Sequence, residues 1–150
     1  MFFCQFLDLC LSFLPQLRIA KEAFTLIPEA QAKPKLHVEH AVHISRRLDQ
    51  LGYRSSRVGD AAMALDVLEA GETEVDLLLS DMVMPGEMGG LDLARAVRQM
   101  RGDMPIVLMT GYSDAAAAAA AEGIDLLVKP YTMEALGNAL DSAIAGSVAA

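Results

Sequence analysis

The sequence predicts an α/β protein, a doubly wound parallel sheet with helices on both faces, and three observations lead to this prediction. From about residue 52, short apolar runs alternate with amphipathic helical segments, as βα units around a parallel sheet do. The apolar runs are continuous and short, as in strands buried on both faces. Turn-forming residues bound each run.

The first elements follow helical and extended patterns in turn. Residues 39–51 have a helical pattern, and Gly52 separates them from a short strand at residues 53–58. Asp60 is placed to cap the next helix, and Gly71 stands where a left-handed C-terminal residue is favoured. The apolar face of this helix consists of Ala61, Ala64, Leu65 and Leu68.

Two apolar runs predict the next strands, at residues 75–79 (VDLLL) and 105–109 (PIVLM). A loop with one proline and three glycines, residues 85–90, follows the first of them. The helix between the strands ends near Gly102. Its predicted buried stripe is Leu93, Ala96, Val97 and Met100.

An alanine run at residues 115–121 predicts a further helix, opened by Ser113 and Asp114 and closed by Gly123. Alanine has the highest helix propensity, so the run needs no functional explanation. Residues 125–128 (DLLV) then predict another buried strand.

The last predicted helix begins after Thr132, which can cap it, and carries Glu134 in its first turn. A carboxylate there interacts favourably with the helix dipole. The predicted buried side consists of Leu136, Ala139, Leu140, Ala143 and Ile144.

Charge and cysteine content exclude several classes of protein. The net charge of −8 and the absence of a basic run argue against nucleic-acid binding, which requires a basic face. Cys4 and Cys10 match no zinc or redox spacing. We interpret them as free thiols in the reducing cytoplasm, where we expect the protein to act.

The N-terminal segment differs in composition from the rest of the chain. Residues 1–15 (MFFCQFLDLCLSFLP) carry most of the phenylalanines, lack a basic start and contain Asp8. The apolar run is too short to cross a bilayer, so we expect no membrane association. We therefore divide the chain into an atypical hydrophobic segment, residues 1–35, and a domain at residues 36–150.

Chemically capable residues end three of the predicted strands. Asp81 follows VDLLLS, Thr110 follows PIVLM, and Lys129 follows DLLV. Each alone would be an ordinary turn, strand or surface residue. In open parallel sheets, however, ligands bind outside the carboxyl ends of the strands. A carboxylate, a hydroxyl and an ammonium there could accept and stabilise a phosphoryl group, and Pro130 could fix the lysine backbone through a cis bond.

Three stretches resemble the receiver domain of two-component response regulators, above all receivers of hybrid sensor histidine kinases. They are LLLSDMVMPGEMGGLDLARAVR, PIVLMTGYS and LLVKPYTMEAL, and the likeness covers residues 48–145. It implies a flavodoxin-like fold and a signalling module that is not an enzyme. By this resemblance Asp81 is the phospho-acceptor in a phosphorelay, and the donor is a histidine kinase or a histidine phosphotransfer protein.

The resemblance also assigns roles to neighbouring residues. Thr110 is the switch hydroxyl, Lys129 the phosphate-facing lysine, and Gly111 the small residue that leaves room for the phosphoryl group. Val83 offers a backbone carbonyl to Mg²⁺, together with Asp81.

The sequence departs from the family where Mg²⁺ would bind. Receivers have an acidic pair after their first strand, and here Lys35 and Leu36 lie near that position. Mg²⁺ prefers oxygen ligands including one or two carboxylates. Glu29 is the nearest substitute and Glu39 the next, so we expect weak or absent Mg²⁺ binding.

The same departure affects the fold. In the family's strand order 2-1-3-4-5 the first strand is central, and we expect it to be irregular or missing. The two candidates for this position are residues 36–38 (LHV) and residues 24–27 (FTLI).

Other interpretations remain for this chain. The main alternative is a degenerate receiver that is not phosphorylated and acts as a protein–protein interaction module. His37, His40 and His43 have a spacing that suits three-way metal binding poorly on a helix. A haloacid dehalogenase would need a second acid at Val83, and a nucleotide-binding fold would need a glycine-rich phosphate loop, which the sequence lacks.

Overall fold

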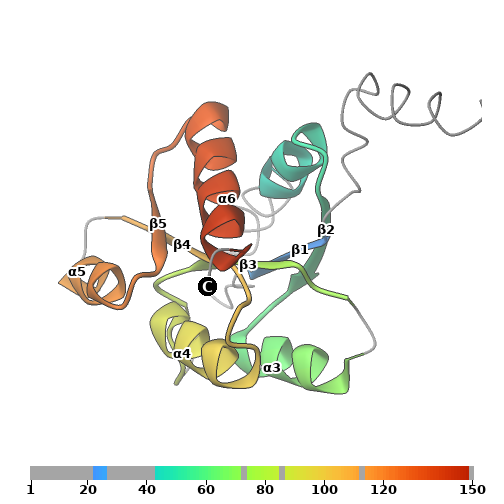
Figure 1. Cartoon of the computed structure of the whole chain (residues 1–150), viewed down its shortest axis with the longest axis vertical. Coiled ribbons are helices and arrows are strands. Elements are labelled where there is room, and N and C mark those ends of the chain that lie inside the picture. Colours follow the sequence, from blue (N-terminus) through green and yellow to red (C-terminus); the bar gives the residue numbers. More distant parts are fainter. Residues whose placement is uncertain (1–21, 27–42, 72–73, 85–86, 112–113, 149–150) are drawn as a thin grey trace, which may run out of the picture.

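A five-stranded parallel sheet forms the centre of the computed structural model, which describes residues 22–26, 43–71, 74–84, 87–111 and 114–148 (Figure 1). The strands stand in the order β2-β1-β3-β4-β5, and every neighbouring pair is parallel. Their bounds are β1 Glu22–Leu26, β2 Arg54–Val58, β3 Leu77–Asp81, β4 Ile106–Thr110 and β5 Asp125–Val128.

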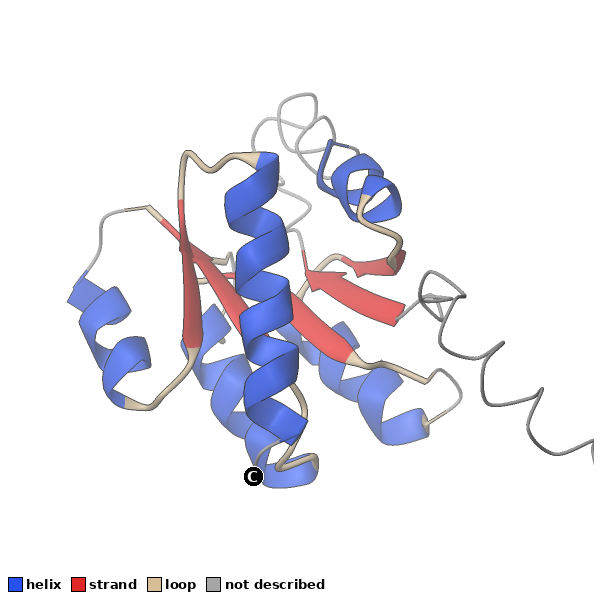
Figure 2. Cartoon of the chain, turned by 45° about the horizontal axis from the view of Figure 1, so that its top comes forward, coloured by secondary structure: helices blue, strands red, loops and turns tan. Residues whose placement is uncertain are grey.

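Helices cover both faces of the sheet, which confirms the predicted fold class. Figure 2 shows α6 across one face and α3 and α4 beyond the other. The helical bounds are α3 Ala61–Ala70, α4 Gly90–Met100, α5 Asp114–Ala121 and α6 Met133–Val148, and residues 43–50 are also helical. None of the helices in these ranges is both long and apolar enough to cross a bilayer.

Side chains that alternate along the strands divide the core into two layers. Leu78 and Leu108 pack with α3 and α4, whereas Leu77, Leu79 and Met109 pack with α6 and the helix at 43–50. Successive side chains of a strand point to opposite faces, so a continuous apolar run is required when both faces are covered.

The central position of the sheet is filled, contrary to the prediction of a missing or irregular first strand. β1 pairs with β2 from Glu22↔Arg54 to Leu26↔Val58, and with β3 from Ala23↔Leu77 to Leu26↔Ser80. Unpaired buried backbone groups are costly, so the slot next to β3 needs a strand. Of the two candidates, FTLI at 24–27 overlaps β1, while LHV at 36–38 lies outside the described residues.

Most boundaries agree with the sequence, with small shifts at strands. β3 and β4 begin later than predicted and run on to Asp81 and Thr110, because their pairing continues to Asp81↔Met109 and Thr110↔Val128. β5 has the predicted bounds.

The predicted caps are present. The side chain of Asp60 accepts a hydrogen bond from the Met63 amide at 2.8 Å, and that of Thr132 accepts one from the Ala135 amide at 3.1 Å. Gly71 has a φ of 65°, the left-handed cap. One face residue differs, because Met100 at the end of α4 is 40% exposed and Ala94 is buried instead.

Candidate functional site

Backbone hydrogen bonds hold the three predicted site residues together at one edge of the sheet. Asp81, Thr110 and Lys129 end or follow the adjacent strands β3, β4 and β5. The Met82 amide donates to the Met109 carbonyl at 2.8 Å, and the Lys129 amide donates to the Thr110 carbonyl at 2.7 Å. These hydrogen bonds extend the pairing past the last strand residues, so the side chains at the three strand ends lie at one edge of the sheet.

Lys129 and Asp81 form an ion pair between Nζ and Oδ1. The Asp81 side chain keeps 17% of its surface exposed and the Lys129 side chain 33%. The carboxylate is therefore sheltered but still open to a reactant from solvent. The Lys129–Pro130 peptide bond is cis, as the X-Pro sequence allowed.

Thr110 is 3% exposed, and its hydroxyl donates to the carbonyl of Gly111. A Cβ added at Gly111 would meet no described atom within 4 Å apart from its chain neighbours, so Gly111 itself is open on that side. Val83 is 78% exposed. Glu29 and Glu39 lie outside the described residues, and within those residues no three His, Cys, Asp or Glu side chains gather to hold a metal.

Gly90 contributes to the site by close backbone approach. Its amide donates to the Met82 carbonyl at 3.0 Å. A Cβ at Gly90 would lie 2.1 Å from the carbonyl oxygen of Asp81, so only glycine allows α4 to start this close to the acceptor strand. The sequence signals a glycine-rich loop but does not say which glycine is under this constraint.

Arg47 and Tyr131 form a second contact near the site that the sequence does not reveal. The guanidinium carbon of Arg47 lies 5.6 Å from the centroid of the Tyr131 ring, and its Nη1 donates to the Tyr131 carbonyl at 3.4 Å. The Tyr131 hydroxyl donates to the sulfur of Met109 at 3.2 Å. Burial raises the pKa of Tyr131, Arg47 opposes this, and Asp81 adds to it.

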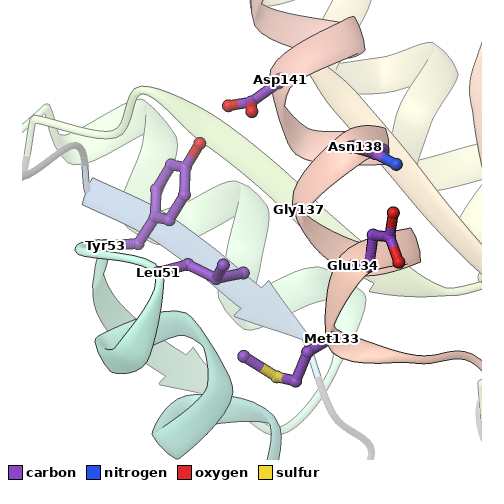
Figure 3. A pocket seen from close by; sticks show the side chains of 7 residues that line it. All are labelled: Leu51, Tyr53, Met133, Glu134, Gly137, Asn138 and Asp141. Atoms are coloured by element: carbon purple, nitrogen blue, oxygen red, sulfur yellow. The ribbon is translucent and has the colours of Figure 1, made fainter.

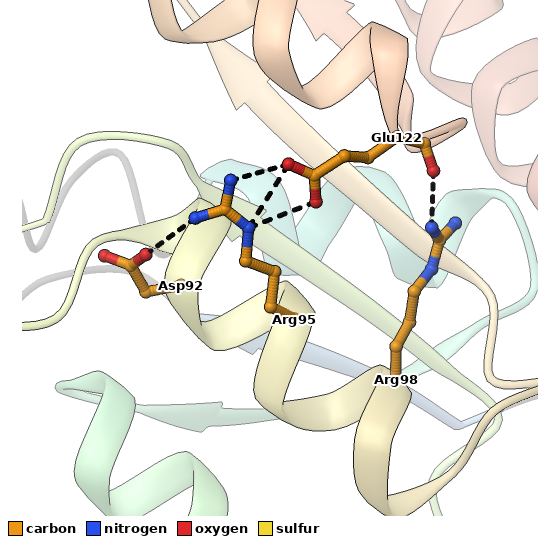
Figure 4. A network of polar contacts seen from close by, with 4 residues as sticks. All are labelled: Asp92, Arg95, Arg98 and Glu122. Carbon is orange, nitrogen blue, oxygen red and sulfur yellow. Dashed lines mark hydrogen bonds and ion pairs between the residues drawn. The ribbon is translucent and has the colours of Figure 1, made fainter.

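A network of arginines joins α4 to the end of α5 (Figure 4). Arg95 bonds both carboxylate oxygens of Glu122 and also Asp92, while Arg98 donates to the carbonyls of Glu122 at 2.6 Å and Gly123 at 3.0 Å. These carbonyls follow α5 and lack helical partners of their own. Arg98 therefore caps the alanine helix from a neighbouring element.

A shallow pocket of about 280 Å³ lies apart from these residues, between α6 and the turn before β2 (Figure 3). Figure 3 shows the Tyr53 ring on one side and α6 on the other. Its volume lies just below the range of about 300–1,000 Å³ typical of small-molecule clefts. It is lined by Leu51, Tyr53, Met133, Glu134, Gly137, Asn138 and Asp141.

Comparison with known families decides the identity of the fold. The model of the response regulator receiver domain matches residues 37–141, more than two thirds of the chain. The chain belongs to the response regulator receiver domain family. This confirms the resemblance drawn from the three motifs and makes the protein a signalling module of two-component systems.

Receivers of different proteins are similar to this one. It is 32% identical over 96 residues to the sensor kinase CckA of Brucella abortus, covering 62% of this chain and 10% of that protein. With the response regulator receiver protein CpdR of the same organism it shares 31% identity over 99 residues, 64% of this chain and 80% of CpdR. The chain spans 18% of the transcriptional regulator NtrC of Klebsiella pneumoniae, which it matches over 53% of its own length at 39% identity.

Solved receiver structures share the fold. A receiver protein from Sinorhizobium medicae has a TM-score of 0.71 at 22% identity, covering 86% of this chain and 98% of that one. A receiver domain from Clostridium thermocellum has a TM-score of 0.73 at 21% identity over 86% of this chain and 98% of that one. At this identity the similarity shows the fold alone.

Proposed function

We propose that this receiver accepts a phosphoryl group on Asp81 from a histidine kinase or a histidine phosphotransfer protein, in a relay that operates in the cytoplasm. The observation that supports this most is the ion pair of Asp81 with Lys129, with the Thr110 hydroxyl on the strand between them. The receiver then acts as a phosphoryl acceptor rather than as an enzyme with a substrate of its own.

The transfer is a nucleophilic displacement at phosphorus. A carboxylate oxygen of Asp81 attacks the phosphorus of phosphohistidine, the P–N bond breaks with its electrons going to the imidazole, and an acyl phosphate remains on Asp81. Lys129, already beside the carboxylate, then pairs with a phosphoryl oxygen. The Thr110 hydroxyl turns from the Gly111 carbonyl to donate to another oxygen. Gly111, which has no side chain, leaves room for the group.

Mg²⁺ would be held by Asp81, the Val83 carbonyl and Glu29. β1 ends at Leu26, paired with Ser80, and Glu29 follows three residues later in the sequence. When bound, the ion would neutralise charge on the phosphoryl oxygens. Because the sequence lacks the family's acidic pair, we expect this binding to be weak.

Phosphorylation would change the face formed by the last two strand–helix units. The modification adds about −1.5 to −2 charges at Asp81, which draws Lys129 and Thr110 inward. Receivers of this family often have an aromatic residue three positions before the lysine, and its rotation reports phosphorylation. Here this residue is Leu126, which packs against the core, so no aromatic side chain at this position can report the change.

Labelling with radioactive acetyl phosphate tests the proposal. Wild-type protein with Mg²⁺ should incorporate label, and Asp81→Asn should incorporate none. The matched control is Asp66→Asn, an exposed aspartate on α3, which should label like the wild type. Label that persists in Asp81→Asn would place the acceptor elsewhere.

A Mg²⁺ titration separates this function from the degenerate receiver suggested by the missing acidic pair. If Mg²⁺ at saturating donor produces no label and no spectral change near Asp81, the domain is a non-phosphorylated interaction module. If label appears only at high Mg²⁺ and falls further in Glu29→Gln, Glu29 supplies the missing carboxylate.

The acyl phosphate should be long-lived. Val83 and Tyr112 stand two residues beyond the acceptor and the switch residue, and side chains at these positions restrict the approach of water in this family. Decay of label within seconds after donor removal would contradict this expectation.

A further inference from the structure

The turn that carries Lys129 is attached to β4 at two points. The Lys129 amide donates to the Thr110 carbonyl at 2.7 Å. The hydroxyl of Tyr131 donates to the sulfur of Met109, the residue before Thr110. The lysine thus begins a short turn whose two ends are both attached to β4.

Arg47 makes two further contacts with this turn. It reaches from the helix at 43–50, stacks over the Tyr131 ring at 5.6 Å and donates to the Tyr131 carbonyl at 3.4 Å. A guanidinium over an aromatic face is attracted by the ring quadrupole, and its planar fork can bond a carbonyl at the same time. Both contacts fall on one residue, two positions after Lys129.

The residues on either side of Tyr131 in this turn are exposed. Pro130 has no amide hydrogen to donate and is exposed, and Thr132, which caps α6, is exposed as well. Between the lysine and α6, Tyr131 is the half-buried residue that packs against the core. Its packing therefore helps to hold the backbone that carries the Lys129 side chain.

We propose that Arg47 is a positioning residue of the Asp81 site, which fixes the Lys129 turn by stacking on Tyr131 and bonding its carbonyl. This inference rests on the proposed phosphoryl-acceptor function and assigns to it a residue far from Asp81 in sequence. Arg47 touches neither the phosphoryl group nor Asp81, and it acts through Tyr131.

The rate of labelling from acetyl phosphate tests this role. Arg47→Ala should lower the rate at saturating donor by about threefold to tenfold, the effect of losing a half-buried cation–π contact. The half-saturating donor concentration should stay unchanged, because donor binding is not affected. Arg47→Lys keeps the charge but loses the planar guanidinium group, so its labelling rate should fall between those of the wild type and Arg47→Ala.

The matched control is Arg46→Ala, which removes the same charge from the neighbouring, exposed position. Its rate should equal that of the wild type. Equal losses in Arg46→Ala and Arg47→Ala would show a general charge effect and overturn the inference, as would a wild-type rate in Arg47→Ala. In Tyr131→Leu, which keeps the backbone carbonyl but not the ring, the further change Arg47→Ala should have a smaller effect than in the wild type.

Amide hydrogen exchange supplies a readout that does not depend on phosphorylation. In Arg47→Ala the Lys129 amide should exchange faster, while the Met82 amide, bonded to the Met109 carbonyl, should keep its rate. Faster exchange at both amides would indicate global destabilisation, and no change at Lys129 would refute the positioning role. If wild-type protein takes no label, the proposed function fails, but the exchange rates still decide the role of Arg47.

Discussion

Replacing Gly90 by alanine tests how closely α4 approaches the acceptor strand. The new Cβ would lie 2.1 Å from the Asp81 carbonyl oxygen, 2.9 Å from Met82 Cα and 3.0 Å from the Asp81 carbonyl carbon. Carbon and oxygen in contact normally stay about 3.3 Å apart. All three clashes involve backbone atoms, so the start of α4 and the end of β3 must separate by about 1 Å.

Two opposing effects set the expected magnitude. Overpacking costs about 1–3 kcal/mol in the free energy of unfolding, and the upper end applies because backbone cannot rotate away. In a helix, alanine is more stable than glycine by about 0.5–1 kcal/mol, which partly offsets this cost. The net loss should be about 2 kcal/mol, which lowers the thermal midpoint by about 4–8 °C for a chain of this size.

Urea and thermal unfolding provide the measurement, with Gly146→Ala as the control. Gly146 lies in α6, and its added Cβ meets no atom within 4 Å, so this variant should gain stability. If Gly90→Ala is as stable as Gly146→Ala, the inferred clash between the start of α4 and the end of β3 is wrong. The labelling rate of Gly90→Ala should also fall by about 10²-fold, the usual effect of a 1 Å displacement of a reacting group.

Three further predictions concern residues other than the acceptor. Arg98→Ala removes two hydrogen bonds to the carbonyls after α5 and should cost about 1–2 kcal/mol in urea unfolding; a loss below about 0.5 kcal/mol would contradict the capping role. The hydrogen bond from Arg95 lowers the pKa of Glu122 below 4.5, so this pair stabilises the fold above that pH and the stability is lost as pH falls through the lowered value. Glu122→Gln should therefore flatten the acid limb of the stability curve, and an unchanged slope would argue against the ion pair. Burial raises the pKa of Tyr131, so the stability of the fold falls as pH rises from about 10 through the raised value. In thermal unfolding, Tyr131→Phe should lose less stability than the wild type over this pH range, and equal losses would refute the prediction.

Local patterns in the sequence predicted most elements because the forces behind them act over a few residues. The cap at Asp60 and the left-handed Gly71 each depend on a short stretch of chain. The apolar runs that became β3, β4 and β5 are continuous because both faces of the sheet are covered. The juxtaposition of Asp81 and Lys129 followed from a rule about parallel strand ends, and the ion pair between them agrees with it.

The central strand shows where local patterns stop being sufficient. The sequence offered two short segments, at 24–27 and at 36–38, as candidates for the first strand, and pairing with both β2 and β3 places β1 at Glu22–Leu26, which overlaps the first of them. Strand pairing is a contact between residues far apart in sequence, so periodicity within either segment carries no information about its neighbours.

By itself, therefore, the sequence determined the helices and strands from β2 onward, their caps, and the three residues that end adjacent strands, because hydrogen bonding and burial within each element depend on nearby residues. Only the tertiary structure decided that β1 occupies the centre, that Gly90 touches the Asp81 backbone, and that Arg47 stacks on Tyr131. These contacts join elements separated along the chain, and their geometry arises only when the two helical layers close on the sheet.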